Sequence, residues 1–259
     1  MFVTGIILFC QLSGIFVAYS PHWALLMRIA FISDIHGNLE ALERTLEKVH
    51  ELQSDRIYCL GDIVGYGPYP NECVTIVRER CTAVVQGNHD SGVIGTTPLD
   101  EFNSYGQAAI EWTTARLTTA HRRYLESLPL ILTEGNLTLT HASPYKPKEW
   151  MYVVTWPQAK LAFTAFKSQL CFIGHTHRPL IIGEDQSVDA FNNRGRFLIN
   201  VGSVGQPRDG FKEASFGFLD TKAWTCEILR VAYNIDRTAE AIQKAGLPEY
   251  LARRLYLGI

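Results

Sequence analysis

Residues 27–49 read MRIAFISDIHGNLEALERTLEKV and contain the clearest structural signal of the chain. Its first part, residues 29–33, is an apolar run typical of a buried strand, and the run stops at Asp34 and His36. Leucines then recur at helical spacing, and Asn38 stands where it can cap that helix. The stretch therefore predicts a β-strand followed by an α-helix, with two metal-binding residue types in the loop between them.

The same arrangement, an apolar run closed by polar residues of the kinds that bind metals, occurs four more times along the chain. The later runs are residues 57–60, 83–86, 137–140 and 171–173. In sheets connected by helices, ligands collect outside the carboxyl ends of the strands, so the five segments are expected to bring their polar residues together. The candidate metal ligands are Asp34, His36, Asp62, Asn88, His141, His175 and His177.

Length and composition are those of an ordinary globular protein. The chain has 259 residues, of which 47% are hydrophobic and 19% charged, and its formal net charge is -2. Because there is no basic excess, stable binding to nucleic acids is not expected. The six cysteines are scattered without a CxxC pair, which favours free thiols in a reducing compartment. The expected location is therefore cytoplasmic.

Residues 1–26 form an apolar N-terminal extension that does not fit this picture, and three interpretations stay open. A signal peptide would carry a positive charge before its apolar run, yet the first Lys or Arg is Arg28. A membrane anchor needs roughly 20 apolar residues, and this run is shorter. We favour the third interpretation, a mis-assigned start with translation beginning at Met27. Membrane association is expected only if the extension is retained as an anchor.

The rest of the chain, residues 27–259, is expected to form a single domain. Alternating strand and helix patterns argue for parallel pairing, and residues 98–129 are predicted to be a helical insertion that could cover the site. Two further helices are expected over residues 235–245 and 248–256. Between the helical insertion and these two helices, the expected strands are residues 137–140, 170–173, 180–182, 197–201, 216–219 and 225–231. These strands require a second sheet.

Two divalent ions held side by side need a carboxylate that reaches both. Asp62 stands in the middle of the candidate set and is the expected bridge, since paired hydrolytic ions lie roughly 3.5–4 Å apart. The other donors are imidazoles, a carboxylate and an amide, with no thiolate. Such a set suits Mn, Fe, Zn, Ni or Co better than Ca or a structural zinc. The expected cofactors are two divalent transition-metal ions of unspecified identity.

The motifs of the chain resemble those of calcineurin-like metallophosphoesterases in both order and spacing. They are Asp34-Ile35-His36-Gly37-Asn38, Gly61-Asp62, Gly87-Asn88-His89-Asp90, His141 and Gly174-His175-Thr176-His177. Residues 61–73 and 200–210 also resemble the bacterial subgroup related to diadenosine tetraphosphatases and serine/threonine phosphatases. The resemblance implies an α/β (α+β) fold, built as a four-layer αββα sandwich with two mixed β-sheets.

The resemblance also implies a division of the ligands between two metals, with His89 as a catalytic histidine that binds neither. The first metal would be held by Asp34, His36, Asp62 and His177, and the second by Asp62, Asn88, His141 and His175. The expected function is hydrolysis of phosphate mono- or diesters by a hydroxide that bridges the metals. The expected partner is a small phosphate ester or a nucleotide, and no oligomeric state is predicted.

Three more residues are candidates for parts of this site. Asp90 is expected to orient His89, because it is the adjacent carboxylate, and it could instead cap a helix. Arg178 and Arg208 are candidates for contacts to phosphate through charge-assisted hydrogen bonds.

Three alternatives to a simple phosphoesterase stay open. A non-catalytic binding scaffold of the same fold would be expected to have lost His89 or a metal ligand, and here all of them are present. A dinucleoside polyphosphate hydrolase would favour a basic pocket that spans several phosphates, whereas the sequence shows only isolated arginines near the motifs. Phosphoprotein phosphatases of the family carry Asp and Arg three and four residues after the bridging Asp, where this chain has Gly65 and Tyr66.

Overall fold

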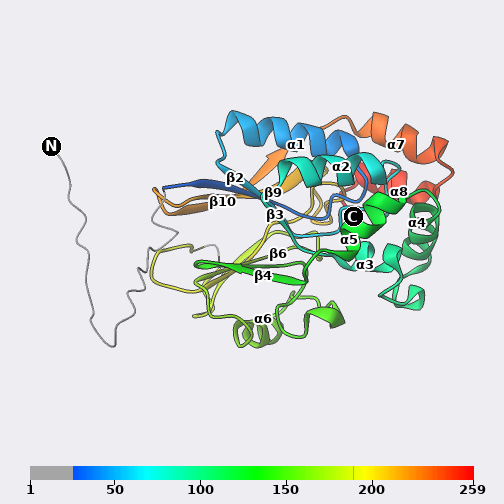
Figure 1. The fold of residues 1–259 in the computed structure, drawn as a ribbon. Helices are drawn as coiled ribbons and strands as arrows, with labels where there is room; N and C mark the ends of the chain where they lie inside the picture. The colour runs from blue at the N-terminus through cyan, green and yellow to red at the C-terminus, as the bar shows by residue number, and fades with distance from the viewer. Residues whose placement is uncertain (1–25, 189) are drawn as a thin grey trace, which may run out of the picture.

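The computed structural model describes residues 26–188 and 190–259. The expected extension, residues 1–26, lies outside the described residues except for Leu26, so the division of the chain at this point stays a prediction. Two mixed β-sheets of five strands each lie face to face, with helices on their outer sides (Figure 1). This is the predicted four-layer αββα sandwich.

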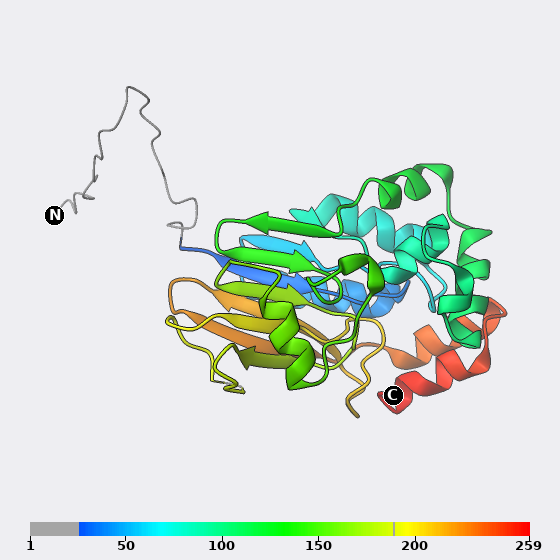
Figure 2. The same cartoon turned by 90° about the horizontal axis from the view of Figure 1, so that it is seen from below.

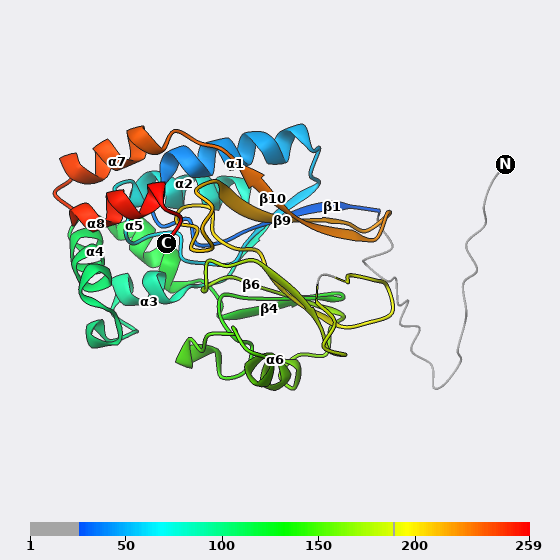
Figure 3. The same cartoon turned by 180° about the vertical axis from the view of Figure 1, so that it is seen from behind.

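The first sheet has the strand order β10-β9-β1-β2-β3. Strands β1, β2 and β3 run parallel, while β9 and β10 are antiparallel to their neighbours. The helices α1, α2 and α7 cover its outer face (Figures 1 and 3). The bounds are β1 Arg28–Ile32, β2 Arg56–Cys59, β3 Ala83–Val84, β9 Ala214–Asp220, β10 Thr225–Val231, α1 Leu39–Glu51, α2 Pro70–Arg80 and α7 Ile235–Lys244.

The second sheet has the strand order β4-β5-β6-β8-β7, in which β5, β6 and β8 are parallel and the two edge strands are antiparallel. Helix α6 covers its outer face (Figure 1). The bounds are β4 Ile131–Glu134, β5 Leu137–Thr140, β6 Leu170–Ile173, β7 Leu180–Gly183, β8 Phe197–Asn200 and α6 Trp156–Phe163. Neither β4 nor α6 was predicted from the sequence.

The remaining helices gather at one end of the sandwich, beyond the carboxyl end of β1 (Figure 2). Two of them, α4 and α5, lie in the stretch predicted as a helical insertion. The predicted final helix is broken, because α8 ends at Arg253 and a 3-10 turn, Arg254–Tyr256, follows it. The bounds are α3 Asn88–Ile94, α4 Ser104–Thr114, α5 Thr119–Glu126 and α8 Glu249–Arg253, with further 3-10 turns at Leu99–Glu101 and Pro147–Glu149.

Strand β1 shows how the sequence builds both sides of the sheet, since its side chains alternate between two cores. Ile29 and Phe31 belong to the core between the sheets, where the Phe31 ring stacks on Phe172 of β6 with centroids 3.6 Å apart. Ala30 and Ile32 belong to the core beneath the helices. All of these side chains are buried, and full burial of a large apolar side chain stabilises the fold by about 1.5–3 kcal/mol. The end of β1 is thereby fixed from both faces.

Asn38 caps α1, as predicted. Its Oδ1 accepts a hydrogen bond from the backbone N–H of Ala41 (3.2 Å), and its Nδ2 donates to the carbonyl of Gly205 (2.8 Å). Because Gly205 lies in the segment after β8, this one side chain both starts the helix and holds two loops of the site end together.

Two further findings concern the cysteines and the helices. The five described cysteines, Cys59, Cys73, Cys81, Cys171 and Cys226, are free thiols. Within residues 26–188 and 190–259, no helix is both long enough and apolar enough to cross a bilayer.

Candidate metal centre

The seven predicted ligands come from the ends of strands in both sheets, and all are buried. Asp34 and His36 follow β1, and Asp62 follows β2. Asn88 is the first residue of α3, which follows β3 after residues 85–87. From the second sheet, His141 follows β5, while His175 and His177 follow β6. The facing sheets therefore deliver the two halves of the site to one place.

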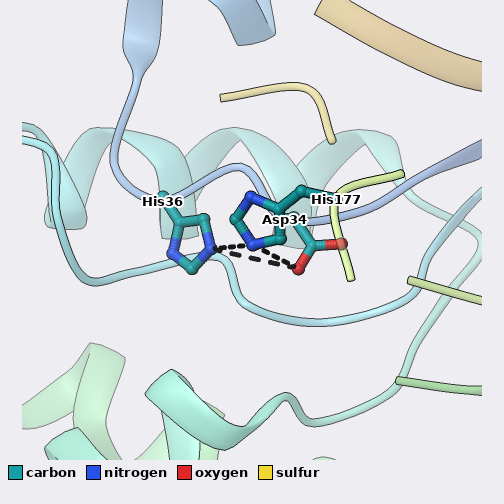
Figure 4. Close-up of side chains that lie close together, drawn as sticks. All are labelled: Asp34, His36 and His177. Atoms are coloured by element: carbon teal, nitrogen blue, oxygen red, sulfur yellow. Dashed lines mark hydrogen bonds and ion pairs between the residues drawn. The ribbon is translucent and has the colours of Figure 1, made fainter. Parts of the chain in front are cut away.

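A first cluster joins Asp34, His36 and His177 (Figure 4). The Nε2 atoms of the two histidines are 3.1 Å apart. Asp34 Oδ1 lies 3.2 Å from His177 Nε2 and 3.9 Å from His36 Nε2. One carboxylate oxygen and two ring nitrogens thus converge on a single point.

A second cluster is centred on His141. Its Nε2 lies 3.3 Å from Asp62 Oδ2, 3.1 Å from Asn88 Oδ1 and 3.2 Å from His175 Nδ1. The resemblance to calcineurin-like metallophosphoesterases implied that these same four residues hold one ion.

Asp62 stands between the two clusters. Its Oδ2 lies 3.3 Å from His141 Nε2 in the second cluster and 3.6 Å from His36 Nε2 in the first. Its Oδ1 accepts a hydrogen bond from the backbone N–H of His89 (2.8 Å), which fixes the carboxylate. One oxygen therefore faces both clusters, the position that a bridging ligand requires.

The hydrogen bonds of the rings show that a cation fits here. Three rings place Nδ1 against a main-chain carbonyl, which can only accept, so Nδ1 carries a proton and Nε2 is the atom that presents a lone pair when the ring is neutral. These contacts are His36 to Val64 (3.1 Å), His141 to Leu60 (2.8 Å) and His177 to Gln206 (2.5 Å). In the first cluster two lone pairs consequently face each other at 3.1 Å with no proton between them.

The spacing of the donors suits a transition metal. Metal–nitrogen bonds of about 2.0–2.1 Å separate neighbouring ligand atoms by roughly 3.0–3.4 Å. The second cluster and the His177 contacts of the first fall in this range, while His36 Nε2 lies farther from Asp34 Oδ1 (3.9 Å) and Asp62 Oδ2 (3.6 Å). The donors are imidazole nitrogens, carboxylate oxygens and an amide oxygen, a set suited to Mn, Fe, Zn, Co or Ni. The buried His/Asp clusters are thus consistent with a dinuclear metal site.

The electrostatics favour the metal-binding charge state at Asp34 and His175, and a positive charge at His141. Burial opposes ionisation of Asp34, but the neighbouring His177 ring outweighs it and holds the Asp34 pKa well below its usual range. Burial lowers the pKa of His175 to about 3, so that ring is neutral. His141 differs: burial opposes its charge, yet the Asp62 carboxylate raises its pKa to about 9. Positive charge is therefore favoured beside Asp62.

Several of the proposed ligands have a backbone conformation that residues other than glycine rarely adopt. Their φ angles are positive, and each such residue costs on the order of 1–3 kcal/mol that the surrounding structure must offset. The residues and angles are Asp34 at 53°, His36 at 52°, Asp62 at 52°, His175 at 68° and His177 at 57°. Strain concentrated in this way is typical of functional sites.

His89 lies beside the first cluster, but Asp90 does not orient it. The His89 ring is 4.9 Å from the His36 ring between centroids, and its Nδ1 has no hydrogen-bond partner. The Asp90 carboxylate instead accepts from the backbone N–H groups of Ile63 (2.9 Å), Val64 (3.2 Å) and Gly87 (3.0 Å). Adjacent side chains on a helix point in different directions, so the expected Asp90 contact is wrong and its capping role holds.

The reason that His89 lacks a partner is the glycine at position 65. A Cβ built on Gly65 would lie 2.6 Å from His89 Nδ1. Position 65 is therefore close enough to contact the His89 ring, but glycine has no side chain that could bind Nδ1. On its other side the ring packs against Tyr66, with centroids 4.4 Å apart.

The two predicted phosphate contacts differ in position. Arg178 is exposed, and its Nε donates to the carbonyl of Arg208 (2.8 Å), so it supports the loop of Arg208. Arg208 is half-buried, and its charge is among the causes, after burial, that lower the pKa of His89 and His177. Arg254, which the sequence analysis did not single out, reaches the same region and lies 6.0 Å from the centre of the Tyr66 ring.

Comparison with known proteins agrees with this geometry. The model of the calcineurin-like phosphoesterase superfamily domain matches residues 27–223. The chain belongs to this superfamily. The matched region contains every residue of the two clusters. The narrower resemblance to diadenosine tetraphosphatases and serine/threonine phosphatases remains a prediction.

Similar proteins cover most of this chain. The uncharacterized protein MJ0912 of Methanocaldococcus jannaschii is 43% identical over 241 residues, 89% of this chain and 98% of that protein. A crystal structure of a metallophosphoesterase from Sphaerobacter thermophilus is 43% identical, with a TM-score of 0.81, and covers 90% of this chain and 99% of that one. Phosphodiesterase YfcE of Escherichia coli is 27% identical over 75% of this chain and 88% of its own length.

Proposed function

We propose that this protein is a dinuclear metal-dependent phosphoesterase that hydrolyses phosphate mono- or diesters. The single observation that carries the proposal is the shared oxygen of Asp62, which faces two clusters of buried imidazole nitrogens at 3.3 and 3.6 Å. Two cations bound there would supply charge to polarise a phosphoryl group and to lower the pKa of a water molecule.

The residues of the chain have separate tasks in this proposal. Asp34, His36 and His177 hold one ion, while Asn88, His141 and His175 hold the other, with Asp62 shared. His89 faces the phosphoryl group and donates a hydrogen bond or a proton to the leaving oxygen, the usual task of an imidazole at such a site. Arg208 binds phosphoryl oxygens, for which its planar guanidinium is suited.

Two alternatives lose support. A phosphoprotein phosphatase would need groups to pair with His89 and to grip phosphate after Asp62, and Gly65 leaves His89 Nδ1 unpartnered. A non-catalytic scaffold would have no use for seven buried metal-binding side chains, five of them on residues with strained backbone conformations. We retain a small phosphate ester or nucleotide as the expected substrate and the cytoplasm as the expected compartment. Native metals of the Mn, Fe, Zn, Ni or Co group stay part of the proposal.

The test is metal-dependent hydrolysis of paired chromogenic substrates, p-nitrophenyl phosphate and bis(p-nitrophenyl) phosphate. Protein starting at Met27 is stripped with a chelator, and Mn, Ni, Co, Zn or Mg is added back singly. Turnover should require added metal and should fall by about 10²–10⁴-fold in a His89→Ala variant. His50→Ala is the matched control, since His50 is exposed on α1 and the same atoms are removed.

Each outcome has a defined meaning. Turnover that survives the chelator, or that is equal in the two histidine variants, would contradict the assigned mechanism. Two bound metals per chain with no turnover on either substrate would favour the scaffold. Absence of bound metal would remove the dinuclear site itself.

A further inference from the structure

Two arginines converge on one aromatic ring at the edge of the metal centre. The guanidinium carbon of Arg208 lies 5.8 Å from the centre of the Tyr66 ring, and that of Arg254 lies 6.0 Å from it. The Tyr66 ring is itself 4.7 Å from the ring of His36, a ligand of the first cluster. Arg254 also lies 5.3 Å from the ring of Tyr250, so aromatic faces hold it in place.

Within the described residues, no Asp or Glu carboxylate lies within 4.0 Å of either guanidinium. Arg208 donates from Nη2 to the neutral Gln206 Oε1 (2.8 Å), and Arg254 donates from Nε to an oxygen of Ile259 (2.5 Å). The neighbouring acid, Asp209, is engaged by Arg230. Even if the Ile259 oxygen is counted against Arg254, one positive charge remains unmatched. Burial and then the charge of Arg208 lower the pKa of Arg254, as expected for like charges held together.

The position of Arg208 connects this pair to the metals. Its backbone N–H donates to the carbonyl of His177 (3.2 Å), a ligand of the first cluster. An anion bound by the two guanidinium groups would therefore sit next to a phosphoryl group at the metals. Since guanidinium forks match phosphate oxygens in geometry and charge, a phosphoryl group is the anion they suit best.

We propose that Arg208 and Arg254 form a subsite for a second phosphoryl group. The inference rests on the proposed phosphoesterase function and deepens it: the preferred substrates carry two or more linked phosphoryl groups, one at the metals and the next at the arginines. Arg208 and Arg254 are far apart in the sequence, and in the folded chain they would form, together with the metal centre, a basic site that spans more than one phosphate.

The direct test is a binding measurement that requires no turnover. Isothermal titration of metal-loaded protein, dialysed free of excess metal, compares imidodiphosphate with orthophosphate. Wild-type protein should bind imidodiphosphate at least tenfold more tightly. Arg254→Gln should reduce this preference by about 10–100-fold, the range for a lost charged hydrogen bond. Arg253→Gln is the matched control, because it removes the same charge from the exposed preceding residue of α8 and should keep the preference.

Several results would overturn the subsite. Equal affinities of the wild-type protein for imidodiphosphate and orthophosphate would overturn it. This comparison needs no variant, so it remains decisive even if the Arg254→Gln protein does not fold. An equal loss in the Arg253→Gln control would reduce the effect to general charge. Equal affinity for 2-phosphoglycolate and imidodiphosphate would contradict its assignment to a phosphoryl group. The chromogenic assay is independent: its failure with a retained imidodiphosphate preference would sink the catalytic proposal and leave the subsite.

Discussion

Replacing Gly65 with alanine should separate the role of His89 from general stability. Gly65 has a φ of 88°, and an added Cβ would lie 2.6 Å from His89 Nδ1, about 0.8 Å closer than ordinary contact. The ring has little room to retreat, because it packs against Tyr66, His36 and Phe102 with centroids 4.4, 4.9 and 5.0 Å away. The methyl group should therefore displace the ring from the phosphoryl site.

The expected size of the effect follows from that overlap. A misplacement of about 1 Å at a reacting group can lower the rate on the order of 10²-fold, so kcat for the chromogenic esters should fall by that amount. The left-handed backbone of an alanine costs about 1–2 kcal/mol, which lowers Tm by roughly 2–8 °C in a domain of this size. The bound metal should be unchanged, because the three atoms nearest the added Cβ all belong to His89, which is not a proposed ligand.

Gly95→Ala is the matched control. Gly95 has a φ of 85°, close to that of Gly65, but nothing lies within 4 Å of the Cβ that would be added. Both variants should therefore lose similar stability from the backbone, and only Gly65→Ala should lose activity. Steady-state kinetics, metal content and thermal unfolding are measured on the same preparations. Unchanged kcat in Gly65→Ala, with full metal content, would refute the reasoning about His89.

Three further predictions concern the metals, the core and the thiols. Bound metal should raise Tm by roughly 5–10 °C per site at metal concentrations about 100 times Kd, and Asp62→Asn should abolish most of this rise. Asp100 is exposed, so Asp100→Asn should retain the rise. Equal rises for the two variants in thermal scans would argue against the shared oxygen of Asp62. Phe172→Ala should cost about 3–5 kcal/mol in urea unfolding, and the exposed Phe211→Ala less than about 1 kcal/mol; similar losses would contradict the stacked core. Burial raises the pKa of Cys226 to about 12, so this thiol should react with Ellman's reagent only after denaturation, in protein starting at Met27. Unfolded thiols ionise near about pH 8.5 and therefore release protons that the folded state retains, so stability should fall as pH rises above about 8.5 towards 12; a flat profile would count against this assignment.

Much of the fold could be predicted because its signals are local. Strands β5, β6 and β10 have the predicted bounds, since short runs of branched and apolar residues end at clear turn signals. The Asn38 cap was predictable for the same reason. The β4 strand was missed although Gly135-Asn136, a signal for a hairpin turn, separates it from β5. Helix α6 was missed although Thr155 and Gln158 form the pair of a capping box at its start.

The errors at the site have another origin. Asp90 was expected to meet His89 because the two are adjacent in sequence, but a helix starts at Asn88 and turns the carboxylate towards three backbone amides. Arg254 carried no signal, since a pair of arginines such as Arg253 and Arg254 in a helical stretch is ordinary. Its place beside Tyr66 depends on where α8 and the following turn pack, and no local pattern contains that information.

The sequence by itself determined which residues form the candidate metal centre, because strand ends and polar loops are properties of short segments and the order of motifs is specific. How those residues meet became visible only in the folded chain. One oxygen of Asp62 faces both clusters, and Gly65 leaves His89 without a partner. The guanidinium groups of Arg208 and Arg254 both lie near the Tyr66 ring. The physical reason is that the direction of a side chain at a loop is set by packing and hydrogen bonds to distant segments, which exist only once both sheets are in place.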